Sequence, residues 1–397
     1  MRDPAPVPAA SRLRALDGLR GFALLGISLV NILYWSGWVL MTQAQQVTHA
    51  GEEPRRVQWF FDHLLLDGKF YTLFSLMFGV GCAMQLQRLQ AAGHDGVRVY
   101  RRRMAVLLCF ALVHTLLIWD GDILMLYALL GLLLPWFARL PDRRLLAWAA
   151  MLVFVVPLAG PALFETAGWN PGARVMDASL QWYAAMGGDP AIDAGVRSLQ
   201  HAGWREQLAW NSSGTLYSWG VRLESWRIPK VLGIMVLGLW VGRRIARGEL
   251  IGDARLLKRI LLVGLMVGLP ASLVYASLPD VGQSHWSSAI GTVPLGLAYA
   301  SAFLLAWPKA ERVLGIFAVP GRMPLSNYLG QSIVNGLVFF GVGLGWIGQL
   351  SLSAIYIYAL SLFALQVLLS RWWLSQRAQG PAEALWRHFT YPRVAQV

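Results

Sequence analysis

Residues 145–164, LLAWAAMLVFVVPLAGPALF, decide the class of fold because they contain no charged side chain. An α-helix needs about 20 consecutive apolar residues to cross the hydrocarbon core of a bilayer. Similar apolar stretches recur along the chain, separated by short polar connections. The sequence therefore predicts an all-α, polytopic transmembrane helical bundle of about ten membrane helices, near residues 19–40, 69–87, 104–118, 123–138, 145–164, 229–246, 258–278, 286–307, 324–343 and 352–374.

The composition agrees with this class of protein. Hydrophobic residues make up 56% of the chain, charged residues only 14%, and the mean hydropathy is +0.49, which a soluble domain of 397 residues seldom reaches. The net charge of +13 comes from short basic clusters scattered between apolar runs, so the expected partner is a lipid bilayer and no nucleic acid. Two cysteines, both inside apolar segments, favour neither a disulfide framework nor a metal site.

The distribution of Lys and Arg predicts the topology. Short cytoplasmic loops of membrane proteins carry an excess of these residues. If the N-terminus is cytoplasmic, most of the 34 Lys and Arg residues lie in the segments that this topology places on the same side. Both termini are therefore expected in the cytoplasm, with cytoplasmic segments at residues 1–18, 87–103, 139–144, 243–259, 308–323 and 371–397.

We expect a single integral membrane domain over residues 1–397, divided by one long loop. The N-terminal helical half covers residues 1–164, a polar periplasmic loop covers 165–228, and the C-terminal helical half covers 229–397. The loop is interpreted either as a lid or substrate platform, or as an amphipathic surface segment that links the two halves.

A histidine inside an apolar stretch is the first candidate for chemistry. His114 in LLCFALVHTLLIWDGDILMLY precedes Asp120 and Asp122, which are expected on a short outer connection. Imidazole exchanges protons near neutral pH, and a carboxylate can fix its tautomer and raise its basicity. Asp120 reaches His114 only if the chain bends back after the helix. The alternative is a buried histidine that makes only a helix–helix hydrogen bond.

Charged residues near the ends of two other predicted helices also need a reason, because charge inside a bilayer is costly. Asp17 and Arg20 are three residues apart on one helical face, which predicts a local ion pair. Lys69 at the start of the next span either pairs with Asp67 or binds an anionic group.

A polar stripe follows a broken segment at residues 320–324. Asn327, Gln331 and Asn335 recur every four residues and must face protein or a water-filled cavity. They either hold helices together or bind a ligand. Arg322, beside free backbone amides at the helix start, suits an anion such as phosphate.

The chain resembles the YeiB-like family of bacterial inner-membrane proteins. The resemblance rests on residues 17–32, DGLRGFALLGISLVNI; 70–81, FYTLFSLMFGVG; 114–124, HTLLIWDGDIL; 321–332, GRMPLSNYLGQS; and 380–391, GPAEALWRHFTY. It covers nearly the whole chain and implies a multi-pass protein of the bacterial inner (cytoplasmic) membrane. The function of that family is unknown.

The DGLRG pattern is also similar, over a short stretch, to membrane acyltransferases of the heparan-alpha-glucosaminide N-acetyltransferase and acyltransferase-three groups. That likeness implies transfer of an acyl group from cytoplasmic acyl-coenzyme A (acyl-CoA) to an acceptor, with a membrane-embedded histidine. In those enzymes the histidine follows the first helix, where His49 and His63 of this chain have no convincing local match. His114 has to take that role here.

The leading hypothesis is a membrane acyltransferase that acts on a glycan, lipid or small-molecule acceptor. His114 is the general base, and Asp120 or Asp122 holds its imidazole. Candidates for binding the acyl-CoA are Asp17, Arg20, Lys69, Arg322 and Arg387, with Asn327 and Gln331 polarising the thioester carbonyl. The alternatives are a transporter or exporter of a small or lipidic solute, and a structural subunit without chemistry. Glycine-rich helix faces would serve a homodimer or internal packing equally.

Overall fold

The computed structural model describes residues 9–191, 195–249, 253–279 and 281–391, and this part of the chain is helical with no β-strand. The α-helices are α1 (Ala9–Trp35), α2 (Gln43–Ala50), α3 (Glu52–Phe61), α4 (Lys69–Ala91), α5 (Gly96–Leu117), α6 (Leu124–Gly131), α7 (Leu134–Phe137), α8 (Asp142–Ala150), α9 (Val156–Ala167), α10 (Pro171–Ala185), α11 (Gly195–Gln200), α12 (Trp204–Glu224), α13 (Arg227–Ala246), α14 (Ala254–Val263), α15 (Leu269–Ser277), α16 (Trp286–Gly321), α17 (Pro324–Phe339), α18 (Leu352–Gln376) and α19 (Pro381–Thr390).

Each apolar run named above coincides with helical structure. The run at 145–164 lies in a continuous helix formed by α8, a π-helical turn (Met151–Val155) and α9, and the run at 258–278 lies in α14, a second π-helical turn (Gly264–Gly268) and α15. The run at 123–138 is not one helix, because the chain breaks after Gly131 into the short helices α6 and α7. The expectation of one continuous helix there is therefore wrong.

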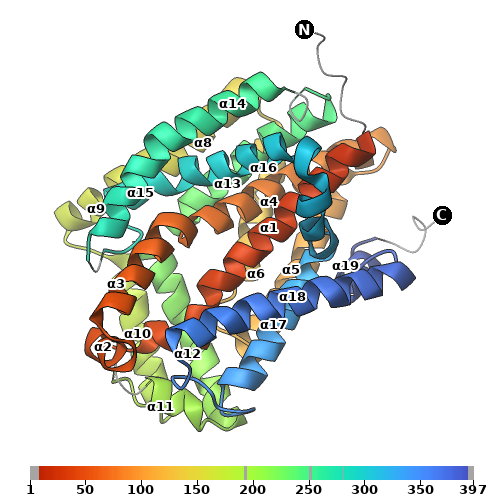
Figure 1. Cartoon of the computed structure of the whole chain (residues 1–397). Helices are drawn as coiled ribbons and strands as arrows, with labels where there is room; N and C mark the ends of the chain where they lie inside the picture. Colours follow the sequence, from red (N-terminus) through yellow and green to blue (C-terminus); the bar gives the residue numbers. More distant parts are fainter. Residues whose placement is uncertain (1–8, 192–194, 250–252, 280, 392–397) are drawn as a thin grey trace.

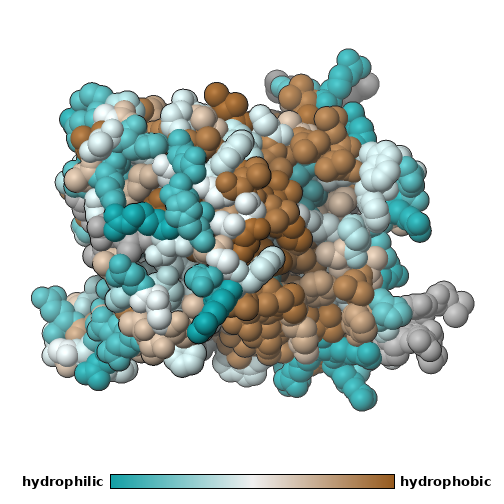
Figure 2. Space-filling model, turned by 90° about the horizontal axis from the view of Figure 1, so that it is seen from below, coloured by the Kyte–Doolittle hydropathy of each residue, from teal (hydrophilic) through white to brown (hydrophobic). Residues whose placement is uncertain are grey.

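Six helices in the described residues are long and apolar enough to cross a membrane. They are Arg14–Trp35, Glu52–Ala91, Asp142–Ala167, Ala254–Ser277, Trp286–Gly321 and Leu352–Gln376. Figure 2 shows a broad band of hydrophobic residues on the surface with hydrophilic residues on both sides of it. Such a band would be unfavourable in water, so these are the features of a membrane protein.

The bundle is built around α1 and α4 (Figure 1). Helix α13 packs along α4, and α16 packs along α1. One end of the bundle carries α2, α10, α11 and α12, and we call it the hairpin end. The opposite end carries the start of α1 together with α19, and we call it the α19 end.

The segment at 165–228 is structured as helices rather than as an open loop. Helices α10 and α12 pack against each other as a hairpin, and α12 also packs on α5. Asn211 of α12 donates to the backbone oxygen of Leu116 at 3.2 Å, and the hydroxyls of Thr115 and Thr215 are 2.9 Å apart. The hairpin therefore covers the end of α5, where His114 lies.

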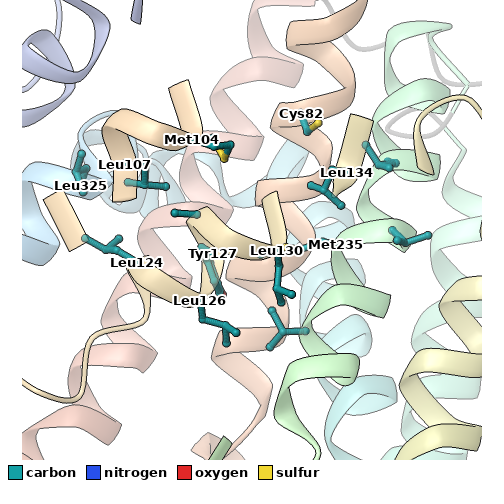
Figure 3. Packing of buried hydrophobic residues seen from close by; sticks show 14 of the residues in the cluster. Cys82, Met104, Leu107, Leu124, Leu126, Tyr127, Leu130, Leu134, Met235 and Leu325 are labelled. Carbon is teal, nitrogen blue, oxygen red and sulfur yellow. The ribbon is translucent and has the colours of Figure 1, made fainter. Parts of the chain in front are cut away.

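A hydrophobic core forms around the two short helices. Leu124, Leu126 and Tyr127 of α6 and Leu134 of α7 are buried among side chains of α4, α5, α13 and α17 (Figure 3). The labelled neighbours from those helices are Cys82, Met104, Leu107, Met235 and Leu325. Neither α6 nor α7 alone is long enough to span a bilayer, and most of their side chains are buried in this core, whereas Leu129 and Trp136 are exposed.

Glycines allow α4 and α13 to pack closely. A Cβ atom at Gly79 would lie 2.0 Å from the backbone oxygen of Met235, and its nearest glycine on α13 is Gly238. A Cβ at Gly81, two residues further along the same helix, would meet nothing within 4 Å. Only the glycine that faces α13 is needed for the close approach.

This difference predicts opposite effects for the same substitution at two sites on one helix. Gly79→Ala should lower the melting temperature of the detergent-solubilised protein, because the added methyl group clashes with backbone that cannot move aside. Gly81→Ala should leave it unchanged or raise it, since alanine favours a helix over glycine by about 1 kcal/mol. Equal melting temperatures for the two variants would contradict the α4–α13 contact.

Candidate functional site

His114 lies in the last turn of α5 and is fully buried, with 0% of its surface exposed. Its Nδ1 is 2.9 Å from Oδ1 of Asp122. The backbone N–H groups of Ile118 and Trp119 both donate to the backbone oxygen of His114, at 2.9 and 2.8 Å, so the helix ends there and the chain turns back. This turn brings the carboxylate of Asp122 to the imidazole of His114, where an acidic partner was expected.

The carboxylate of Asp122 is held on both oxygens. Its Oδ2 accepts the backbone N–H of Met125 at 2.7 Å, in the first turn of α6. A carboxylate can only accept hydrogen bonds, so the proton of a neutral imidazole belongs on Nδ1 and Nε2 keeps its lone pair. Nε2 of His114 is buried and has no hydrogen-bond partner among the described residues. The pair therefore presents an oriented, unoccupied proton acceptor.

Aromatic side chains surround this imidazole. The ring of Tyr328, on α17, has its centroid 5.1 Å from that of His114, and the ring of Trp119 lies at 6.5 Å with its plane perpendicular. The hydroxyl of Tyr328 accepts the backbone N–H of Ile123 at 3.4 Å. Tyr328 thus connects α17 to the turn that carries Asp122.

Asp120 faces α12 instead of His114. A Cβ atom at Gly214 would lie 2.2 Å from its Oδ2, and its backbone oxygen accepts the hydroxyl of Ser218 at 3.1 Å. Burial in this turn between α5 and α6 raises the pKa of Asp120 to about 6. Of the two acids proposed to hold the imidazole, Asp122 is the one in contact.

Arg222 of α12 is a site residue that the sequence analysis did not single out. Its side chain is only 4% exposed, and its Nη2 donates to the backbone oxygen of Asp122. Its Nε has no partner among the described residues. The sequence does show that Arg222 is a charged residue in an amphipathic stretch. Nothing in its local sequence connects Arg222 to the turn at Asp122, about a hundred residues earlier.

The polar stripe on α17 faces α18, away from His114. Asn327 donates to Ser370 at 3.0 Å, Gln331 donates to Gln366 at 2.6 Å, and Asn335 accepts from Tyr358 at 2.9 Å. These bonds satisfy buried amides between two helices, which is the helix-joining role that the sequence analysis weighed against binding.

The charged candidates at the α19 end lie apart from His114. Asp17 and Arg20 form the expected ion pair at 2.5 Å. Arg322 is exposed and donates to the backbone oxygen of Ala378 at 3.4 Å, and the exposed Arg387 lies over the ring of Tyr391. A Cβ at Gly321 would touch the backbone oxygen of Asp17, so Arg322 is beside the Asp17–Arg20 pair.

Lys69 lies near the opposite end of the bundle. Its Nζ donates to the backbone oxygen of His63 at 2.5 Å, and its own backbone oxygen packs against Gly296 of α16. No hydrogen bond or ion pair in the described residues joins Lys69 to Arg20 or Arg322. The structure therefore does not bring these three candidates together in one site.

The backbone N–H groups at the start of α17 were predicted to suit a phosphate. In the structure a carboxylate side chain accepts them. Glu383 of α19 accepts the backbone N–H groups of Leu325 at 2.7 Å and Ser326 at 3.2 Å, and also the hydroxyl of Ser326. A carboxylate at a helix N-terminus is stabilised by the helix dipole and the free N–H groups. This contact explains the acidic residue in the GPAEALW segment.

Within the described ranges, no group of three or more His, Cys, Asp and Glu side chains is placed to hold a metal ion.

Comparison with known proteins supports the resemblance found in the sequence. Residues 243–393 match a family model described as "Protein of unknown function (DUF418)". The chain is 28% identical to the uncharacterized protein YxaH of Bacillus subtilis (strain 168), over 97% of this chain and 96% of that protein. It is also 28% identical to the uncharacterized protein YeiB of Escherichia coli (strain K12), over 94% of this chain and 95% of that protein.

The resemblance to the YeiB-like family is confirmed. No solved structure matches the chain. The family model covers Arg322, Asn327, Gln331 and Arg387 of this chain, whereas His114 and Asp122 precede it. The two relatives cover nearly the whole chain, so the likeness extends to both halves.

The Glu383 contact gives a stability prediction for this YeiB-like chain. Glu383→Ala should destabilise the protein by about 2 kcal/mol, because it removes a charged cap from α17 and leaves amide donors without partners. Thermal unfolding in detergent measures the change. Glu53→Ala serves as the matched control, since the Glu53 side chain is 79% exposed and should cost little. If both variants unfold at the temperature of the wild type, Glu383 is not a cap.

Proposed function

We propose that the protein is a membrane acyltransferase that passes an acyl group from acyl-CoA to a hydroxyl or amine acceptor, with His114 as the general base. The observation that carries this proposal is the buried His114–Asp122 pair, with Nδ1 bonded to the carboxylate and Nε2 unoccupied. A merely structural histidine would be expected to use both ring nitrogens when it is buried.

The proposed reaction follows from this geometry. Nε2 of His114 takes the proton of the acceptor as the acceptor atom attacks the thioester carbonyl, and the imidazolium that forms is stabilised by Asp122. The tetrahedral intermediate collapses with cleavage of the carbon–sulfur bond, and the imidazolium returns the proton to the coenzyme A thiolate. Tyr328 is the α17 residue that faces His114, so in this scheme its hydroxyl, in place of Asn327 and Gln331, polarises the carbonyl.

The proposed membrane arrangement has about ten spans in a bacterial inner membrane, with both termini in the cytoplasm. The helices beyond the six long apolar ones are α5, the α6–α7 pair, α13 and α17, which pack within the same bundle. In this topology the α19 end is cytoplasmic, and Arg20, Arg322 and Arg387 there are the candidates for the phosphates of acyl-CoA. The hairpin end, with His114, faces the periplasm and receives the acceptor.

A transporter is the second candidate function, because further ionisable groups are buried just before α4 and at its first residue. Asp62 and Lys69 are buried, and Asp67 accepts from Tyr275 at 2.8 Å and from Gln283. Buried ionisable residues in membrane proteins often bind and release protons or solutes. The two functions differ in a measurable way, because transport leaves the solute chemically unchanged.

Calorimetry and thioester cleavage test the acyltransferase. Wild-type protein in detergent should bind acetyl-CoA or a longer acyl-CoA saturably and should cleave the thioester slowly in the presence of an acceptor or water. His114→Gln and Asp122→Asn should keep the binding but lower the cleavage rate by about 10²-fold or more, since general-base catalysis contributes 10²- to 10⁴-fold. Arg322→Ala should instead weaken the binding.

His94→Gln is the matched control, because His94 is an exposed histidine between α4 and α5. It should behave as the wild type in both assays. Folded wild-type protein that binds no acyl-CoA of any chain length would rule out this function and leave transport as the better proposal.

A further inference from the structure

Three basic side chains converge at the turn between α12 and α13. Arg222 is 4% exposed, Lys230 is 0% exposed, and Arg227 lies between them, half-buried. Arg227 and Lys230 are three residues apart on α13, so the two side chains are neighbours on one face of this helix. Like charges gathered in a buried place are unfavourable unless an anion offsets them.

None of the three has a carboxylate in direct contact. No ion pair within 4.0 Å includes Arg222, Arg227 or Lys230 in the part of the chain that the structure describes. Arg227 donates its Nε to the side-chain oxygen of Gln283 at 3.2 Å, and Arg222 donates to the backbone oxygen of Asp122. The Nζ of Lys230 and the Nε of Arg222 have no partner at all within those residues.

Two acids near these cations are engaged elsewhere, and a third, Asp120, acts on Arg222 only through space. Asp122 bonds to His114 and to the backbone N–H of Met125. Asp67 acts on Lys230 through space, but its two oxygens accept from Tyr275 and Gln283. The turn therefore has charged donors without acceptors, although carboxylates lie near it.

The start of α13 adds further donors. The helix begins at Arg227, has no acidic residue in its first turn and has no side-chain cap, since Trp226 precedes it in a left-handed conformation with φ 53°. The first backbone N–H groups of a helix have no partner inside the helix and carry a partial positive charge. Anions bind at such places, and here two deeply buried basic side chains accompany the helix start.

The hydroxyl of Tyr71, on α4, is one more buried donor without a partner in the described ranges, and the guanidinium of Arg227 lies 5.5 Å from its ring centroid. The backbone oxygen of Tyr71 accepts the hydroxyl of Tyr127 at 3.3 Å. The donors thus lie along a polar seam between α4, α12 and α13 that adjoins the Arg222–Asp122–His114 contacts.

We infer that this seam binds an oxyanion, a carboxylate or a phosphate group, between Arg222, Arg227 and Lys230 at the start of α13. The inference rests on the proposed function in one respect: the anionic group belongs to the acceptor whose hydroxyl or amine meets Nε2 of His114. The acceptor is therefore an acidic molecule, such as a sugar acid, a phosphorylated compound or an anionic lipid headgroup.

The open pocket that Trp226 helps to line is a different feature. It has a volume of about 440 Å³ and is lined by Glu165 and Glu224 together with Trp169. Its carboxylates disfavour an anion. The anion site is therefore placed on the seam side of the turn, toward His114.

Melting temperatures test the anion site without any acyl donor. In neutral detergent at constant ionic strength, sodium phosphate or sodium acetate should raise the melting temperature of the wild type by several degrees over sodium chloride, because a ligand that binds only the folded state stabilises it. Lys230→Met should abolish this rise. In sodium chloride alone, Lys230→Met should melt at or above the wild-type temperature, because the substitution removes an uncompensated buried charge.

Lys309→Met is the matched control, since Lys309 is an exposed lysine on α16 and its replacement should keep the anion effect. If Lys230→Met does not fold, Arg227→Gln at the half-buried position replaces it and should reduce the rise. Nanodiscs that contain phosphatidylglycerol, compared with nanodiscs of phosphatidylcholine alone, show whether the bound anion is a lipid headgroup or a soluble acid. If only phosphatidylglycerol stabilises the protein, the anion is a lipid headgroup. If free phosphate or acetate stabilises it, the anion belongs to a soluble acid.

No stabilisation by any of these anions, or an equal rise in Lys230→Met, would overturn the inference. The anion site and the acyltransferase function can fail independently. Wild-type protein that is stabilised by the anions but binds no acyl-CoA would contradict only the acyltransferase function.

Discussion

The contacts of Asp122 join the end of α5 and the start of α6 to α12, which lies about a hundred residues later in the sequence. Its carboxylate holds His114 at the end of α5 and the first turn of α6, and its backbone oxygen receives Arg222 from α12. All three side chains are buried, where an unpaired polar group costs several kcal/mol. The turn after α5, the start of the short helix α6 and the position of the α10–α12 hairpin therefore depend on one another through this acid.

Most of the fold follows from local properties of the sequence. An apolar run of sufficient length becomes a helix in a membrane wherever it occurs, which is why each of the predicted runs is helical. The break between α6 and α7 was not predicted, because the run at 123–138 is apolar throughout. The α10–α12 hairpin was missed for the opposite reason: its residues are too polar to read as spans, and its helices are stabilised by packing on each other and on α5.

Some features of the candidate site were likewise predictable from local sequence, and others depend on the tertiary fold. The Asp17–Arg20 pair was predictable because residues three apart on a helix are neighbours, and a partner for His114 among the nearby acids was predictable from sequence proximity. Arg222, Tyr328 and Glu383 were not, since each acts on a segment that only the tertiary fold brings near. Glu383 also shows why a helix start rich in free amides is an ambiguous signal, because a carboxylate of the same chain satisfies it as well as a phosphate does.

The separation of the two ends sets a physical condition on acyl transfer. The basic residues at the α19 end and the His114–Asp122 pair lie on opposite sides of the core formed around α6 and α7, where Met104, Leu107 and Leu325 pack together (Figure 3). Apolar side chains in contact exclude water but accept an acyl chain without a desolvation penalty. A thioester that enters at the α19 end could therefore replace contacts among these side chains, whereas the charged nucleotide of coenzyme A would stay outside. The same core limits the access of water to the buried imidazole, so hydrolysis of the thioester would be slow compared with transfer to the acceptor.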